Sequence, residues 1–87
     1  MTPKEKTDYR RMIAERDFKW LAGRVEGRRF MRRLLQECGV YSPTFSQDHG
    51  IMSFQEGKRA LGLWILEQFE NEKELYIQLL TDKQDDT

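Results

Sequence analysis

The sequence predicts an all-α fold, a single compact domain of three to four helices with a long ordered loop between the second and third helices. Its 87 residues leave room for only one hydrophobic core. Charged residues make up 34% of the chain and hydrophobic residues 38%, a balance typical of a soluble, helix-rich protein. Apolar side chains recur at helical spacing, between recognisable helix start and stop signals. We therefore treat residues 1–87 as one helical domain.

The first predicted helix covers residues 3–21. Thr2 supplies a capping hydroxyl, Pro3 stands at the first helical position and Glu5 at the third. Tyr9, Ile13 and Trp20 follow at helical spacing, which predicts that this face packs on the core. Trp20 and the later Trp64 are accordingly interpreted as core residues rather than as stacking platforms.

The second predicted helix covers residues 24–38 and has the clearest periodicity. Its apolar positions share one face of a helix: Gly27, Phe30, Met31, Leu34, Leu35 and Cys38. This pattern predicts that Cys38 is a small buried side chain. Gly39 follows at the position where a left-handed residue ends a helix.

The region from residue 39 to the end predicts a loop and then one or two helices. Val40, Tyr41, Phe45 and Ile51 are expected to hold the loop, residues 39–52, against the core. Ser53 to Glu56 has the sequence of a capping box, so the third helix is expected to begin there. After residue 69, either Asn71 caps a fourth helix or the third helix continues. The polar tail, residues 81–87, is expected to fray.

A Glu-Gly-basic-Arg step occurs twice, as EGRRF at residues 26–30 and as EGKRA at residues 56–60. Gly27 and Gly57 both lie on the apolar face of a predicted helix, which suggests that the two helices cross at these glycines. Gly62 lies off that line and is expected to tolerate alanine. Arg59, three residues after Glu56, is expected to form a structural ion pair, with Glu26 or Glu67 as partner.

Charge is divided unevenly along the chain. Residues 1–33 hold eleven Lys or Arg against five Asp or Glu, a net charge of +6, and residues 34–87 carry −6. One stripe of cations could follow nucleic-acid phosphates: Lys19, Arg24, Arg28, Arg29, Arg32 and Arg33. A solvated helix face and a charged surface for a protein partner are the alternatives.

Signals for catalysis, metals and cofactors are weak. His49 is the only histidine and Cys38 the only cysteine, so the sequence offers no zinc site and no nucleophile with a matching base. There is no phosphate-binding glycine loop. The longest apolar stretch, residues 60–66, is too short to cross a bilayer. We expect a protein without enzymatic activity, cofactor, metal or membrane span.

The third helix is apolar on more than one side. Leu63, Leu66 and Phe69 point away from the face expected to meet the second helix, and a chain this short has little else to cover them. Either the C-terminal segment folds back over them through Leu75, Tyr76 and Leu79, or a second copy does. A homodimer with Leu66 and Phe69 at its interface is the preferred alternative.

Two strings, EGRRFMRRLLQECGVYSPTF and FQEGKRALGLWIL, resemble a family of small tailed-bacteriophage proteins named after a Bordetella phage open reading frame. The resemblance covers residues 18–66. It is carried by Gly27, Leu34, Leu35, Cys38, Gly39, Val40, Phe45, Glu56, Gly57, Arg59 and Ile65. Met31 departs mildly from the pattern, which usually has leucine at that position.

The resemblance implies a phage origin, often beside genes for virion structural proteins, and supplies no catalytic residue. It leads to the expectation of a non-enzymatic phage protein, virion-associated or an assembly accessory, in the host cytoplasm or the virion. Such a protein would act through contacts with a phage structural protein or with itself. A nucleic-acid-binding accessory and a small host-directed protein are the alternatives.

Overall fold

The computed structural model describes residues 1–42 and 47–82, and within them the chain is all-α. Four helices follow one another: α1 (Pro3–Ala22), α2 (Val25–Glu37), α3 (His49–Glu67) and α4 (Lys73–Thr81). Helices account for 78% of the described residues, none of which lies in a strand. The predicted fold class is thus confirmed. Phe45, expected to hold the loop, lies outside the described residues.

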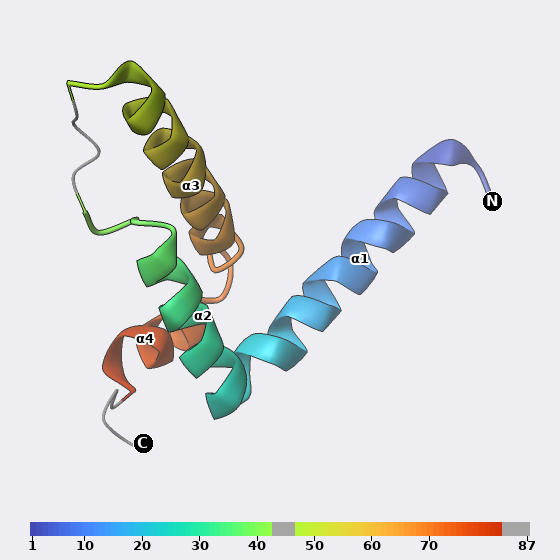
Figure 1. The fold of residues 1–87 in the computed structure, drawn as a ribbon. Helices are drawn as coiled ribbons and strands as arrows, with labels where there is room; N and C mark the ends of the chain where they lie inside the picture. Colours follow the sequence, from blue (N-terminus) through green and yellow to red (C-terminus); the bar gives the residue numbers. More distant parts are fainter. Residues whose placement is uncertain (43–46, 83–87) are drawn as a thin grey trace.

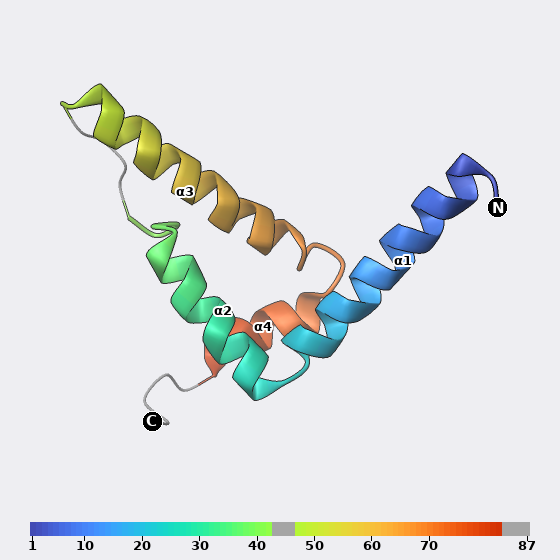
Figure 2. The same ribbon diagram turned by 45° about the vertical axis from the view of Figure 1, so that its right-hand side comes forward.

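The helices form an open V. Figures 1 and 2 show α1 and α3 diverging as two arms from a base made by α2 and α4, with the N-terminus at the tip of the α1 arm. The radius of gyration is 15.9 Å, whereas a globular chain of this length is expected near 12 Å. Much of α1 therefore extends into solvent.

The core lies at the base of the V, where α2 contacts each of the other three helices. Its buried members are Ala22, Met31, Leu35, Cys38, Val40, Ile65, Phe69 and Leu79. The helical periodicity of α2 brings Met31 and Leu35 to one side of that helix, and both are buried as the sequence predicts. Cys38 is buried too, as expected for a small apolar side chain.

Helix α1 begins as predicted, but its core-facing side is not the expected one. The Thr2 hydroxyl accepts a hydrogen bond from the Glu5 amide at 3.2 Å. Ala22 is buried and Phe18 packs against the core, while Trp20, on another side of the helix, is 65% exposed. The interpretation of Trp20 and Trp64 as core residues is therefore wrong, because each lies on a side of its helix that faces away from the core, and Trp64 is 57% exposed.

Helix α2 ends as predicted. Gly39 has a φ of 70°, in the left-handed region. The Gly39 amide donates to the Gln36 carbonyl at 3.0 Å, and the Val40 amide donates to the Leu35 carbonyl at 3.4 Å. These two bonds make a Schellman motif, which satisfies the last carbonyls of α2 and turns the chain toward α3.

Helix α3 begins five residues earlier than the sequence suggests, with its cap at Asp48 instead of Ser53. The Asp48 side chain is the cap, and its Oδ1 accepts from the Ile51 amide at 3.0 Å. The capping-box prediction at Ser53 is therefore wrong, since Ser53 lies within the second turn. An Asp N-cap is as effective as Ser, and Gly50 is tolerated inside the helix.

A tight turn separates α3 from α4, which resolves the two alternatives for the C-terminal region. The amides of Gln68, Phe69 and Glu70 each donate three residues back, to carbonyls 3.0–3.1 Å away. The N-cap of α4 is Glu72 rather than Asn71, and its side chain makes no capping hydrogen bond. Thr81 ends α4 and Asp82 is held by ion pairs, so fraying does not begin at 81; residues 83–87 lie outside the described part.

The glycine that allows α3 to approach its neighbours is Gly62. A Cβ there would collide with Cγ2 of Val40 and lie 2.9 Å from Cβ of Cys38. A Cβ at Gly27 would collide with the Leu21 carbonyl, so this glycine makes room for the end of α1. A Cβ at Gly57 would meet nothing within 4 Å. The predicted crossing of Gly27 with Gly57 is therefore wrong.

Arg59 does not form the expected pair. The ion pairs among the described residues are Lys19–Glu72, Arg28–Asp82 and Arg32–Asp82, so neither Glu26 nor Glu67 is paired with Arg59 there. Arg59 is half-buried and Glu56 is exposed, both on α3.

Candidate functional site

Six cations were predicted to form a nucleic-acid-binding stripe. Two of them, Arg28 and Arg32, instead join α2 to the ends of α1 and α4. The Arg28 guanidinium donates to the Ala22 carbonyl at 2.8 Å and to Asp82 Oδ2 at 2.6 Å. Arg32 donates to the Leu79 carbonyl and to the same Asp82 oxygen, each at 3.2 Å. A cation at the C-terminal end of a helix is favoured by the helix dipole. The two arginines of α2 thus hold the last turns of α1 and α4.

The ion pairs with Asp82 are largely shielded from water. The Arg28 and Arg32 side chains are about one-tenth exposed. The hydrogen bond from Arg28 holds the pKa of Asp82 below its ordinary value of 3.8, with a smaller contribution from Arg32, although burial opposes the shift. Arg28 and Arg32 are therefore engaged within the fold rather than lined up along a solvated stripe.

The other four stripe cations lie nearer to solvent. Lys19 pairs with Glu72 at 3.1 Å, between α1 and the N-terminus of α4. Arg24 lies 5.1 Å from the ring centre of Trp20, and Arg33 lies 6.0 Å from that of Phe30. Arg29 is half-buried on α2.

The three residues expected at a dimer interface have different surroundings. Phe69 is 3% exposed, and its ring meets Phe18 edge-on at 4.8 Å and Tyr76 at 5.9 Å. Leu66 is half-buried against the core, whereas Leu63 is exposed. The prediction that Phe69 lies at a dimer interface is therefore wrong, because α1 and the folded-back α4 cover its ring.

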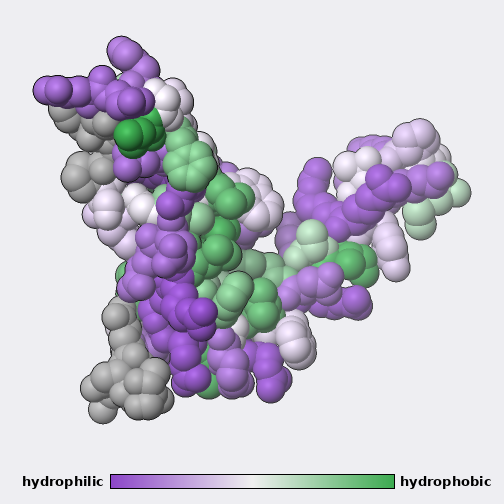
Figure 3. Space-filling view, viewed as in Figure 1, coloured by the Kyte–Doolittle hydropathy of each residue, from purple (hydrophilic) through white to green (hydrophobic). Residues whose placement is uncertain are grey.

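A different set of apolar residues is uncovered on α3. Phe54 is 67% exposed, Leu61 53% and Trp64 57%, and Gly57 lies between them in the same row. Residues spaced by three and four positions share one side of a helix, so these side chains form a continuous ridge. We call Phe54, Gly57, Leu61 and Trp64 the α3 stripe. Figure 3 shows hydrophobic surface running down α3 toward the angle between the two arms.

A second uncovered row lies on α1. Tyr9, Met12 and Trp20 are exposed by half or more, and Ile13 beside them is half-buried. Their spacing places them on one side of the helix, away from Phe18 and Ala22. We call Tyr9, Met12, Ile13 and Trp20 the α1 stripe. Each arm of the V therefore presents a row of large apolar side chains.

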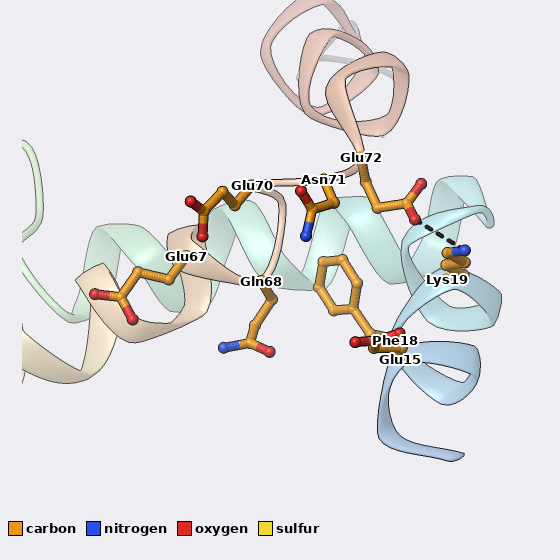
Figure 4. A pocket seen from close by; sticks show the side chains of 8 residues that line it. All are labelled: Glu15, Phe18, Lys19, Glu67, Gln68, Glu70, Asn71 and Glu72. Atoms are coloured by element: carbon orange, nitrogen blue, oxygen red, sulfur yellow. Dashed lines mark ion pairs between the residues drawn. The ribbon is translucent and has the colours of Figure 1, made fainter. Parts of the chain in front are cut away.

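An acidic hollow of about 280 Å³ lies where α1 meets the turn between α3 and α4. Figure 4 shows the carboxylates around it, with the Lys19–Glu72 pair at one side. Its lining is Glu15, Phe18, Lys19, Glu67, Gln68, Glu70, Asn71 and Glu72. Four carboxylates against one lysine give the hollow a net negative charge. Within the described part of the chain, no three His, Cys, Asp or Glu side chains are grouped to hold a metal ion.

Neither stripe was predicted, because the helical spacing of these apolar residues indicates a core face. The signal was present: Phe54, Leu61 and Trp64 lie on a different side of the helix from Gly62 and Leu66, and one small domain has no second core to bury them. The acidic hollow was visible only as the excess of carboxylates after residue 66.

The model of a family described as Bbp19-like phage protein matches residues 18–81, which is more than half of the chain. The match covers the end of α1, all of α2 and α3, and α4 to its last residue. Neither the curated proteins nor the solved structures gave a match. None of the helices in the described part combines the length and apolar character needed to cross a lipid bilayer.

Proposed function

Because the chain belongs to the Bbp19-like phage protein family, we propose that it is a non-enzymatic bacteriophage protein that acts through protein–protein contacts, in the virion or as an accessory to its assembly. The α3 stripe supports this proposal. A row of two aromatic rings and a leucine, each more than half exposed, is unusual on a monomer and typical of an interaction surface.

Several features favour contact over catalysis. His49 is exposed at the start of α3, and Cys38 is buried at the end of α2. Aromatic residues are enriched at the centres of protein interfaces because they bury a large area for little loss of side-chain entropy. Trp64 already stands beside Gly62 and Ile65, which are buried against the core, so its position on the helix would require little further ordering on binding.

Photo-cross-linking during infection tests the proposal. A photoreactive phenylalanine at Leu61 is expected to give one discrete adduct with a phage-encoded protein or with a second copy of the chain. The same probe at Glu74, an exposed residue of α4 outside both stripes, is the control. Equal, diffuse labelling from the two positions would contradict an interaction role for the stripe.

Nucleic-acid binding is the second candidate, favoured by the stacking of Arg24 on Trp20 and of Arg33 on Phe30. Such cation–aromatic pairs can meet a phosphate and a base together. If this surface binds a short duplex, changing Arg24 and Arg33 to alanine should flatten the salt dependence of the affinity by about two units. Fluorescence anisotropy over a salt series measures the slope, with Lys73→Ala, at an exposed lysine of α4, as control. Absence of binding at about 50 mM salt would rule this candidate out.

A further inference from the structure

The structure holds two exposed apolar stripes on two diverging arms, and the chain exposes more surface than a compact monomer of its mass would. The chain exposes 7087 Å², whereas a folded monomer of 10.5 kDa is expected to expose about 5,400 Å². The excess of roughly 1,700 Å² is about twice what each partner contributes to a standard interface.

Helix α1 gives a second reason. Residues 1–12 are all exposed, so the first half of the helix has almost no tertiary support. A helical segment of that length is only marginally stable in water by itself. The occupant of the α3 stripe should therefore also support the α1 arm.

We propose that the occupant is a second copy of this chain, whose α1 arm lies antiparallel along the α3 stripe while its own α3 stripe receives the first copy's α1. This proposal rests on the proposed function and names the partner. The arms match in length, since 20 residues of α1 span about 30 Å and 19 residues of α3 about 28 Å. The exchange is reciprocal and closes with two-fold symmetry.

The register of the stripes supports this arrangement. In an antiparallel pair, Tyr9 of one copy lies beside Trp64 of the other, and Trp20 lies beside Phe54. Along α1, Tyr9 is followed by Met12 and Ile13 after three and four residues, and then by Arg16 after about four more. Along α3, read backwards from Trp64, Leu61 follows after three residues and Gly57 after four more. Leu61 then meets the Met12 and Ile13 pair. Arg16 falls opposite Gly57, where the missing Cβ leaves open space.

Charge supports the same orientation. Residues 1–12 carry four cations, at Lys4, Lys6, Arg10 and Arg11, against two carboxylates. Antiparallel docking brings this basic tip to the base of the other copy, where the acidic hollow lies. The positive end of the α1 dipole points there too. A parallel arrangement would separate the basic tip from the hollow by the length of the arm.

A charge exchange tests orientation and occupant together. By sedimentation equilibrium, the parent is expected to be a dimer at tens of micromolar. Lys4→Glu with Lys6→Glu should weaken it at least about tenfold, as should Glu67→Lys with Glu70→Lys. An equimolar mixture of the two variants should regain dimerisation. Arg29→Glu with Arg33→Glu changes the net charge as the first variant does, but on α2, outside the proposed contact, and should leave the dimer intact.

Disulfide trapping checks the register without depending on charge. Met12→Cys mixed with Leu61→Cys should give an inter-copy disulfide, whereas Met12→Cys mixed with Glu74→Cys should not. A parent that sediments as a monomer at roughly 100 µM would overturn the second-copy inference. The proposed function would survive that result if the photoreactive probe at Leu61 still gave a discrete adduct with another phage protein.

Discussion

Replacing Gly62 by alanine is expected to lower the free energy of unfolding by about 1–3 kcal/mol, even though alanine favours a helix by about 1 kcal/mol over glycine. The added Cβ would overlap Cγ2 of Val40 and approach Cβ of Cys38 to 2.9 Å. Val40 is itself fixed by the Schellman motif after α2, so it has little freedom to move aside. Urea-induced unfolding followed by circular dichroism measures the effect.

Gly57→Ala is the matched control, because it makes the same change in the same helix. A Cβ at Gly57 meets nothing within 4 Å, so only helix propensity should act, and stability should rise by up to about 1 kcal/mol. The two variants are thus expected to shift stability in opposite directions. A stabilised Gly62→Ala protein would show that α3 does not pack closely on the end of α2. Both variants should be measured at one protein concentration, since self-association would add to the apparent stability.

Helix α2 could be predicted well because local and global signals agree along it. Its apolar residues share one face, Gly39 provides the left-handed termination, and Met31, Leu35 and Cys38 are buried accordingly, whereas Phe30, also predicted on that face, is 55% exposed. The start of α1 could also be predicted, because Thr2 suits the N-cap and Pro3 suits the first helical position. In such segments the tertiary structure agrees with the conformation that the local sequence already favours.

The faces of α1 and α3 could not be predicted, because periodicity shows that a helix is amphipathic without showing what covers it. Tyr9, Ile13 and Trp20 form a regular stripe, yet nothing in residues 1–42 and 47–82 buries that side of α1: Tyr9 and Trp20 are exposed and Ile13 is half-buried. The start of α3 failed for another reason. Asp48 and Ser53 are both competent caps, and Gly39, Pro43 and Gly50 favour a loop over residues 39–52.

For the cations on α2, too, the sequence could not show which side chains are engaged within the fold. Arg28, Arg29, Arg32 and Arg33 are equivalent by spacing and charge. Only the fold distinguishes them, because Asp82, fifty residues away, comes to lie against Arg28 and Arg32. An ion pair between residues so distant in sequence leaves no local pattern.

The second large effect is expected at Asp82. Asp82→Ala should lower the free energy of unfolding by about 2–4 kcal/mol, because Arg28 and Arg32 would remain shielded from water without a counter-charge. A domain of this size has a total stability of about 4–13 kcal/mol, so the loss is a substantial part of the total and should lower the melting temperature by at least about 8 °C. Glu72→Ala is the control: it breaks the Lys19 pair, whose lysine is 58% exposed, and should change stability by less than about 1 kcal/mol.

A double variant and an acid titration separate loss of the ion pair from loss of packing. Arg28→Met with Asp82→Leu should be more stable than Asp82→Ala, because Arg28 is removed together with Asp82 and only Arg32 is left shielded without a counter-charge. The lowered pKa of Asp82 means that the folded state favours the ionised carboxylate. Its stabilisation is therefore fully present above the ordinary pKa of 3.8 and is lost as pH falls through the lower folded-state pKa. Unfolding of the parent in urea should show this loss, and Asp82→Asn should show a smaller one. An Asp82→Asn protein with the same stability and acid sensitivity as the parent would show that α1 and α4 are held to α2 by packing alone.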